Sequence, residues 1–342
     1  MEPVTIYTLA KELNMTPSMV SRAFHPQGKI NPEKRELVLE TAKKYGFSPN
    51  QMASRLSRKR VCIGILINSR FTVNTENMMT GIQKAYEQLK DYKVEYQVMT
   101  VNPLETASEE YDRLFEQLAE YDGVIVAGFS SEEYTERLNR FYEKNQRLVQ
   151  VQAVNETANY LFGSKHDERV ASQTAAEFLY QALRYKNRKN ILLFTGNRDS
   201  TLHFCAEKEF MSACDQKGLT VIQSVDMKDQ AEYLEQLLPE LFQQYGKKID
   251  GIYMTSGLSE PLCRYLDQQN LRLPFVAFDL YSEMIPYLEN DVISATIFQN
   301  VADQMQCAFT MLGKHLLQGE KCPRQIYTNV HLVLKSNYKQ YI

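Results

Sequence analysis

Polar and aromatic side chains follow directly after several apolar runs of this 342-residue chain. Asparagine, serine, aspartate and glutamine exchange hydrogen bonds, arginine supplies a positive charge, and phenylalanine offers a ring for stacking. Such a mixture suits a sugar or a similar polyol. The residues in this position are Asn68, Ser69, Arg70, Phe71, Phe129, Ser130, Asn197, Arg198, Asp199, Thr255, Ser256, Asp279 and Gln299.

Catalytic motifs are absent from the sequence. It holds no Gly-x-Ser-x-Gly nucleophile elbow, no His-Glu-x-x-His metal motif and no glycine-rich phosphate loop. The five histidines are dispersed, and the six cysteines form no Cys-x-x-Cys pair, so neither a zinc site nor a disulfide framework is indicated. We therefore expect a binding protein that uses no cofactor or metal, and not an enzyme.

The apolar runs that precede these polar residues alternate with helical patterns from Val61 onward. Residues 62–67 are typical of a parallel strand buried on both faces, and residues 78–89 have the spacing of an amphipathic helix. The alternation continues to a strand that ends at Asp279. The same order of strands and helices starts a second time partway along this stretch, which indicates two similar halves. It predicts doubly wound sheets, which bind ligands beyond the carboxyl ends of their strands.

A different pattern precedes the sheets. Thr5, Thr16 and Asn31 can each cap a short helix, and Pro17 and Pro32 occupy the first helical position of the second and third helices. Two short helices joined by a tight turn make a helix-turn-helix. The positions predicted to face inward are Ile6, Leu9, Ala10, Leu13, Val20, Phe24, Leu37, Val38, Ala42 and Tyr45.

Charge is divided unevenly along the chain. Residues 1–60 hold 11 Lys and Arg against 5 Asp and Glu, a net of +6, while the remainder holds 28 against 37, a net of −9. Asn50 can cap a helix of two turns through Leu56, which is too short to be stable alone. The basic residues of this segment favour the interpretation that it contacts DNA phosphates over the interpretation that it is merely a solvated linker.

Two runs carry a family resemblance. VTIYTLAKELNMTPSMVSRAFH and KYGFSPNQMASRLSRKR resemble the N-terminus of lactose-repressor type (LacI/GalR family) transcriptional regulators, and DGVIVAG, PFVAFD, SATIFQN and HLVLKSNY resemble pieces of that family's core. The resemblance covers essentially the whole chain. It implies an all-α helix-turn-helix head plus an α/β two-lobed, periplasmic-binding-protein-like core with two doubly wound parallel sheets.

The resemblance also implies domain boundaries. Residues 1–46 form the DNA-binding head, residues 47–60 the hinge helix and linker, and residues 61–342 the effector-binding and dimerisation core. The chain would cross between lobes near Leu161, Ser294 and Arg324. The first lobe then comprises about 61–161 and 295–323, and the second about 162–294 and 324–342.

Binding to a pseudopalindromic double-stranded DNA operator as a homodimer follows from the resemblance. Ser21 and Arg22 lie at the centre of the implied recognition helix, and Leu56 stands where the family inserts a leucine between base steps. His25 is the last residue of the implied recognition helix. Its role there is either to end the helix or to contact a DNA phosphate. The implied DNA-binding residues are Thr5, Tyr7, Thr16, Pro17, Ser18, Ser21, Arg22, His25, Asn50, Ala53, Arg55 and Leu56.

The resemblance places Asp279 and Gln299 where the family's effector-binding aspartate and glutamine lie. An arginine of many sugar-responsive relatives is replaced by Ala206, and their strand-end Asn-Asp reads Ser256-Gly257. Arg198 and Arg70 are the candidates to replace the missing cation. The predicted effector site, for a carbohydrate or a similar small polar molecule, is Asn68, Arg70, Phe71, Phe129, Asn197, Arg198, Ser256, Asp279 and Gln299.

We therefore expect an effector-controlled transcriptional regulator that acts as a repressor. The N-terminal segment has no signal-peptide pattern and no apolar run is long enough to span a membrane, so we expect a cytoplasmic protein. Two alternatives remain at this point. One is a cytoplasmic solute-binding module whose N-terminal helices dock protein, which the +6 charge disfavours. The other is an enzyme on the same two-lobed core, which the missing catalytic motifs disfavour.

Overall fold

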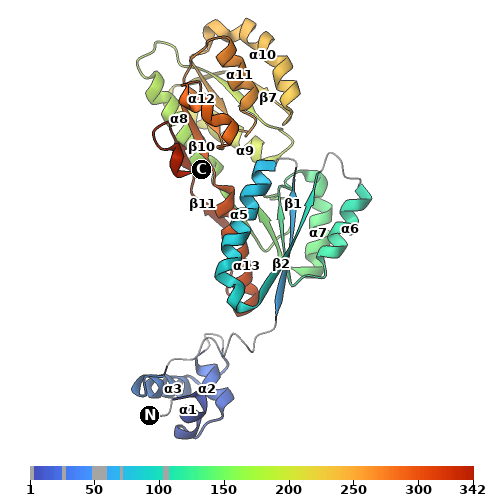
Figure 1. Ribbon diagram of the computed structural model, residues 1–342, viewed down its shortest axis with the longest axis vertical. Coiled ribbons are helices and arrows are strands. Elements are labelled where there is room, and N and C mark those ends of the chain that lie inside the picture. The colour runs from blue at the N-terminus through green and yellow to red at the C-terminus, as the bar shows by residue number, and fades with distance from the viewer. Residues whose placement is uncertain (1–3, 25–27, 48–59, 70–71, 103–107) are drawn as a thin grey trace. The chain divides into compact units, whose positions relative to one another are not determined.

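Three short helices form the N-terminal part of the computed structural model, which describes residues 4–24, 28–47, 60–69, 72–102 and 108–342 (Figure 1). They are α1 (Ile6–Glu12), α2 (Pro17–Ala23) and α3 (Pro32–Lys44). The Thr16 hydroxyl accepts a hydrogen bond from the Met19 amide at 3.2 Å, and the Asn31 side chain accepts one from the Glu33 amide at 2.8 Å. The predicted starts of α2 and α3 are thus confirmed.

The three helices enclose a small apolar core that includes the fully buried Val20 and Val38. Two residues predicted to be buried are not: Leu37 is 47% exposed and Tyr45 is 39% exposed. Leu37 is one residue from Val38, and one residue turns a helix by about 100°. The Tyr45 hydroxyl donates a hydrogen bond to Glu12 at 2.9 Å, which holds the ring at the surface.

The chain divides into two compact units, Met1–Arg60 with Asp91–Lys93 and Val61–Lys90 with Val94–Ile342. In its described residues the larger unit holds two six-stranded sheets. The first runs from edge to edge as β11 (Gln325–Thr328), β5 (Phe162–His166), β4 (Leu148–Val151), β3 (Gly123–Ala127), β1 (Val61–Asn68) and β2 (Val94–Val101). The second runs as β12 (His331–Val333), β10 (Ala295–Phe298), β9 (Phe275–Phe278), β8 (Gly251–Met254), β6 (Asn190–Thr195) and β7 (Thr220–Asp226).

Neighbouring strands are parallel except for the antiparallel pair β10 and β12, so the predicted two-lobed α/β fold is confirmed. Helices cover both faces of each sheet (Figure 1). They are α5 (Thr72–Leu89), α6 (Ser108–Leu118), α7 (Thr135–Asn145), α8 (Glu168–Leu183), α9 (Thr201–Lys217), α10 (Ala231–Tyr245), α11 (Glu260–Gln268), α12 (Ile285–Glu289) and α13 (Val301–Gln318). Short 3-10 turns lie at Lys90–Tyr92, Glu132–Tyr134, Gly246–Lys248, Ser282–Met284 and Tyr338–Gln340.

Helices α5 and α13 pack side by side on the first sheet (Figure 1). Their backbones approach closely at Gly81, where a Cβ atom would lie 2.2 Å from the carbonyl oxygen of Ala302. Glycine therefore permits a contact that any larger residue would push apart. The sequence analysis did not predict α13, although this helix joins the returning chain to the first lobe.

The crossings between lobes fall later than the resemblance implied. β5 and β11 belong to the first sheet, and β10 belongs to the second. The chain therefore crosses after His166, after Phe298 and after Thr328, not near Leu161, Ser294 and Arg324. β5 carries buried Ser164, Lys165 and His166 in place of an apolar run, so its strand character is hidden from a hydrophobicity pattern.

The Thr16 cap gives a test of local stability. Thr16→Ala should destabilise α2 by about 1 kcal/mol, because the Met19 amide loses its acceptor. Amide hydrogen exchange of the peptide spanning α2 should then be about five-fold faster in the full chain. Thr41→Ala makes the same chemical change inside α3, where Thr41 donates to the Leu37 carbonyl, and should leave α2 unchanged. Equal exchange of α2 in wild type and Thr16→Ala would contradict the capping role.

Candidate ligand-binding site

A cavity of about 150 Å³ lies where the carboxyl ends of strands from both sheets meet. Its lining comes from residues at or after the ends of β1, β3 and β4 of the first sheet and of β6, β7, β8, β9 and β10 of the second. The structure brings together five residues of the predicted effector site here, namely Asn68, Asn197, Ser256, Asp279 and Gln299. They share the cavity with Asn74, Ser130, Ser131, Gln152, Ser200, Leu202, His203, Asp229, Thr255, Phe278 and Tyr281.

Two predicted site residues do not line the cavity. Phe129 is 1% exposed and packs edge-on against Tyr134 in the core of the first lobe, with ring centroids 5.1 Å apart. Arg198 forms a two-pronged ion pair with Glu207 at 2.7 and 2.8 Å, so its guanidinium is engaged outside the cavity. The structure therefore does not bring Phe129 and Arg198 together with the other predicted effector residues. Arg70 and Phe71 lie outside the described residues.

The carboxylate of Asp279 is buried in the cavity wall, with 5% of the residue exposed. Its Oδ2 accepts hydrogen bonds from the Tyr281 hydroxyl at 2.9 Å and from Gln299 Nε2 at 3.0 Å. Burial raises the pKa of Asp279 to about 6, against the opposing effect of these donors. The backbone of Asp279 has φ 65°, a left-handed conformation that is uncommon for a residue with a side chain.

Gln299 lies at a crossing and relays hydrogen bonds between the lobes. Its carbonyl oxygen accepts from Gln304 Nε2 at 3.0 Å, and Gln304 is fully buried in α13. The Gln304 carbonyl in turn accepts from the Ser164 hydroxyl of β5 at 2.8 Å. A continuous polar chain therefore links the Asp279 carboxylate of the second lobe to the first sheet.

A histidine and a carboxylate from the second lobe also line the cavity. His203 Nε2 lies 3.3 Å from Asp229 Oδ2, and the Ser256 hydroxyl donates to Asp229 Oδ1 at 3.2 Å. Gly196 lies behind this pair, since a Cβ atom there would come within 2.6 Å of the His203 ring and of Asp229. The glycine lets both side chains approach the end of β6.

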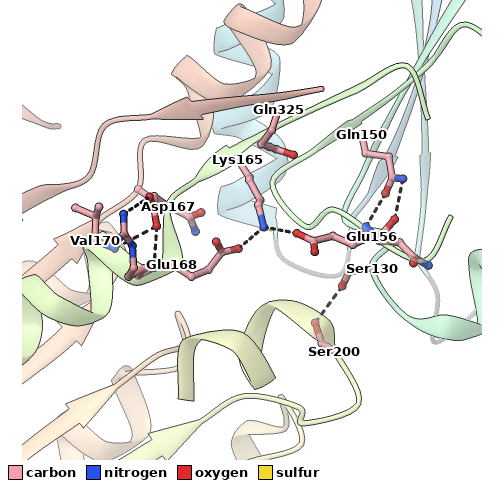
Figure 2. A network of polar contacts seen from close by, with 12 residues as sticks. Ser130, Gln150, Glu156, Lys165, Asp167, Glu168, Val170, Ser200 and Gln325 are labelled. Atoms are coloured by element: carbon pink, nitrogen blue, oxygen red, sulfur yellow. Dashed lines mark hydrogen bonds and ion pairs between the residues drawn. The ribbon is translucent and has the colours of Figure 1, made fainter. Parts of the chain in front are cut away.

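The two lobes touch beside the cavity. The hydroxyls of Ser130 and Ser200 are 3.0 Å apart (Figure 2). Ser131 and Ser200 also form an isolated β-bridge. Ser130 follows β3 of the first lobe, and Ser200 occupies the position before α9 in the second. The structure is therefore a closed arrangement of the lobes.

Several cavity residues were missed by the sequence analysis. Tyr281 lies three residues beyond the end of β9, and Asp229 lies three residues beyond β7, so a wider window at each strand end would have included them. Asn74 and His203 lie on the first turns of α5 and α9. Helix starts that follow strand ends face the same cavity, and this is the signal that points to them.

The predicted DNA-binding residues of α1 and α2 differ in how exposed they are. Tyr7, Ser18 and Arg22 are exposed, with Tyr7 at 74%. Thr5 and Thr16 are exposed caps, Pro17 is the first residue of α2, and Ser21 is half-buried. His25, Asn50, Ala53, Arg55 and Leu56 lie outside the described residues.

Within the part of the chain that the structure describes, no cluster of three or more His, Cys, Asp or Glu side chains has the arrangement of a metal site. Among the same residues, no helix combines the length and the apolar character needed to cross a membrane.

The raised pKa of Asp279 predicts a pH-dependent stability. Between its ordinary value of 3.8 and about 6, the folded chain binds more protons than the unfolded chain, so the free energy of unfolding falls as pH rises through this window. The full effect is about 3 kcal/mol. Asp279→Asn removes the titration but keeps an acceptor for Tyr281 and Gln299. Denaturant titrations should show wild type losing stability relative to this variant between about pH 4 and 6; parallel pH profiles would contradict the assignment.

Comparison with known proteins agrees with this geometry. The model of the periplasmic binding protein domain matches residues 67–321. Catabolite control protein A from Priestia megaterium is 26% identical over 69% of this chain and 70% of its own length. The HTH-type transcriptional regulator pepR1 from Lactobacillus delbrueckii subsp. lactis is 23% identical over 75% of this chain and 74% of its own.

Solved structures show the same fold at low identity. A glucose-galactose binding protein from Geobacillus stearothermophilus has a TM-score of 0.72 and 18% identity, covering 82% of this chain and 99% of that one. A putative LacI transcriptional regulator from Bacteroides fragilis has a TM-score of 0.71 and 15% identity, covering 83% and 100%. Because the matched model spans both lobes and the cavity between them, the chain belongs to the periplasmic binding protein domain family.

Proposed function

We propose that this chain is a cytoplasmic transcriptional regulator of the lactose-repressor type that binds an operator as a homodimer and represses from it. A small polyhydroxylated ligand in the cleft controls its affinity for DNA. The proposal joins two separate activities, one for each compact unit of the chain.

The observation that carries the DNA-binding part is the exposed face of α2. Its Thr16 cap and Pro17 start fix the helix so that Val20 and Ala23 are buried, while Ser18 and Arg22 face solvent. A hydroxyl and a guanidinium on the outside of a short helix are groups that read base edges in a major groove. The excess positive charge of residues 1–60 supplies attraction to phosphates. The similarity to the HTH-type transcriptional regulator pepR1, and to catabolite control protein A, supports the same conclusion.

The cavity supports a carbohydrate as the ligand. Amides, hydroxyls and carboxylates converge on a space of about 150 Å³, and Phe278 and Tyr281 add ring surface. Similar folds include a solute-binding protein from Burkholderia graminis solved with D-arabinose, which has a TM-score of 0.73 and 16% identity over 83% of this chain and 98% of that one. We infer a neutral monosaccharide or a close relative as the effector.

Control of DNA affinity requires that the ligand bind one arrangement of the lobes better than another. The polar chain through Gln299 and Gln304 offers a route, because it ties the cavity wall to α13 of the first lobe. In the proposal, the segment from Asn50 to Leu56 reports this arrangement to DNA, as the resemblance implies.

A solute-binding module without DNA affinity is the competing function, and the abundance of sugar-binding proteins among similar folds favours it. Selection of bound fragments from genomic DNA by the purified full-length chain distinguishes the two. The proposal predicts recovery of fragments that share a pseudopalindromic sequence. Recovery of no fragments at low salt would support the solute-binding module, and recovery of fragments that share no sequence would contradict sequence-specific binding.

Arg22 should determine base preference. A bidentate contact from arginine to guanine discriminates by roughly 1–3 kcal/mol. Arg22→Ala should therefore abolish preference at one base pair of each half-site, while weak salt-dependent binding to any DNA persists. Lys11→Ala removes an equivalent exposed charge from α1 and should weaken binding to all sequences alike. Binding measured on duplexes substituted at single positions would refute the role if Arg22→Ala kept the wild-type preference.

Asp279 and Gln299 should hold the effector. A panel of neutral pentoses and hexoses is first screened for a rise in the melting temperature of the wild-type chain, since a ligand that binds the folded state stabilises it. Asp279→Ala combined with Gln299→Ala should abolish the rise and the ligand's effect on DNA affinity. Glu283→Ala, an exposed neighbour in sequence, is the control and should keep both responses. A full response in the double variant would place the effector elsewhere.

A further inference from the structure

Lys165 lies in strand β5, beside the shortest connection between the two lobes. β5 of the first sheet ends at His166, and α8, which packs on the second sheet, begins at Glu168. Asp167 alone lies between them, where its side chain accepts hydrogen bonds from the Arg169 and Val170 amides at 2.9 and 3.2 Å. The start of α8 is thereby fixed, so a rotation of one lobe against the other must be taken up at this connection.

The ammonium of Lys165 is held between two carboxylates (Figure 2). Its Nζ lies 3.1 Å from Glu156 Oε1 and 3.1 Å from Glu168 Oε1. The side chains of Lys165 and Glu168 are 8% and 9% exposed, whereas that of Glu156 is 55% exposed. The pair between Lys165 and Glu168 is therefore largely shielded from water, and Glu156 lies on its outer side.

These three residues belong to different lobes. Lys165 lies in β5, and Glu156 lies in the loop between β4 and β5, so both are part of the first lobe. Glu168 begins α8, whose buried face includes Ala171, Ala175 and Leu179 in the core of the second lobe. The contact between Lys165 and Glu168 therefore spans the connection about which the lobes rotate.

Breaking this contact is unfavourable. Burial by itself lowers the pKa of Lys165, but the neighbouring Glu168 and Glu156 outweigh it and hold the pKa above its ordinary value. Lys165 thus stays charged, and a buried charge that loses its partner is strongly destabilising. Any movement of α8 that separates Glu168 from Lys165 carries this penalty.

The loop that carries Glu156 also reaches the cavity. Asn155, its neighbour in sequence, donates from its side chain to the Ser131 carbonyl at 3.1 Å and is held by Gln150 through its backbone. Ser131 lines the cavity and bridges to Ser200 of the other lobe. The cluster at the connection and the contact between lobes are therefore joined by one short loop.

We propose that Lys165, Glu156 and Glu168 form a latch that holds the lobes closed in the absence of ligand. The latch sets how often the cavity is closed before a ligand arrives, and a ligand that selects the closed arrangement then binds more tightly. Lys165 acts here as a positioning residue at the connection. The latch is a property of the core alone and does not depend on whether the chain binds DNA.

The experiment traps the closed arrangement chemically. Ser130→Cys with Ser200→Cys places two thiols where hydroxyl oxygens are now 3.0 Å apart, so a disulfide forms between them only when the lobes touch. The ligand-free full chain is oxidised under mild conditions, and peptide mapping by mass spectrometry quantifies the bond between positions 130 and 200, separately from the native cysteines. Thiol labelling of the single Ser200→Cys variant checks that thiol reactivity is unchanged.

Lys165→Met in this background should slow disulfide formation at least five-fold. Lys335→Met removes the lysine of an exposed ion pair with Asp291 and should leave the rate unchanged. Glu168→Gln, which removes the carboxylate that the second lobe supplies to Lys165, should slow it at least two-fold and serves as the decisive variant if Lys165→Met does not fold. Equal trapping rates in the folded latch variants and wild type, or equal slowing by Lys335→Met, would overturn the proposal.

Discussion

The carboxylate of Asp279 is the group on which the geometry of the cleft depends. It is buried at the end of β9 with a left-handed backbone, and it is stabilised by Tyr281 and Gln299 instead of by water. Gln299 lies where the chain crosses to the first lobe, and Gln304 of α13 fixes it from the far side. Desolvation of one acidic group is therefore tolerated only because both lobes supply donors to one polar chain.

The same principle operates at the neighbouring connection. Lys165, which lies beside a crossing between lobes, is like Asp279 a charged group taken out of water, and it is stabilised by partners from both lobes. Placing buried charges where the lobes rotate couples lobe arrangement to electrostatics, because each arrangement either keeps or breaks the pairing. The cavity between these two points then responds to a ligand through the balance of a few strong polar contacts.

Local features of the sequence predicted local structure well. Thr16-Pro17 and Asn31-Pro32 determined helix starts through contacts within three residues, and the strand-end rule found Asn68, Asn197 and Ser256. Features that depend on distant partners were not predictable. Arg198 is engaged by Glu207 of α9, Phe129 turns into an aromatic cluster, and the polar strand β5 is buried only because partners from α8 and α13 satisfy it. The role of Arg70 and Phe71 stays a prediction.

The central claim is that a ligand in the cleft alters binding of the N-terminal helices to DNA. Fluorescence anisotropy of a duplex selected from genomic DNA, titrated with the full chain, measures this directly. The account predicts tighter binding to that duplex than to its scrambled sequence, and a change in affinity when a monosaccharide that stabilises the chain is added. Equal affinity for both duplexes, with no response to the monosaccharide, would contradict it.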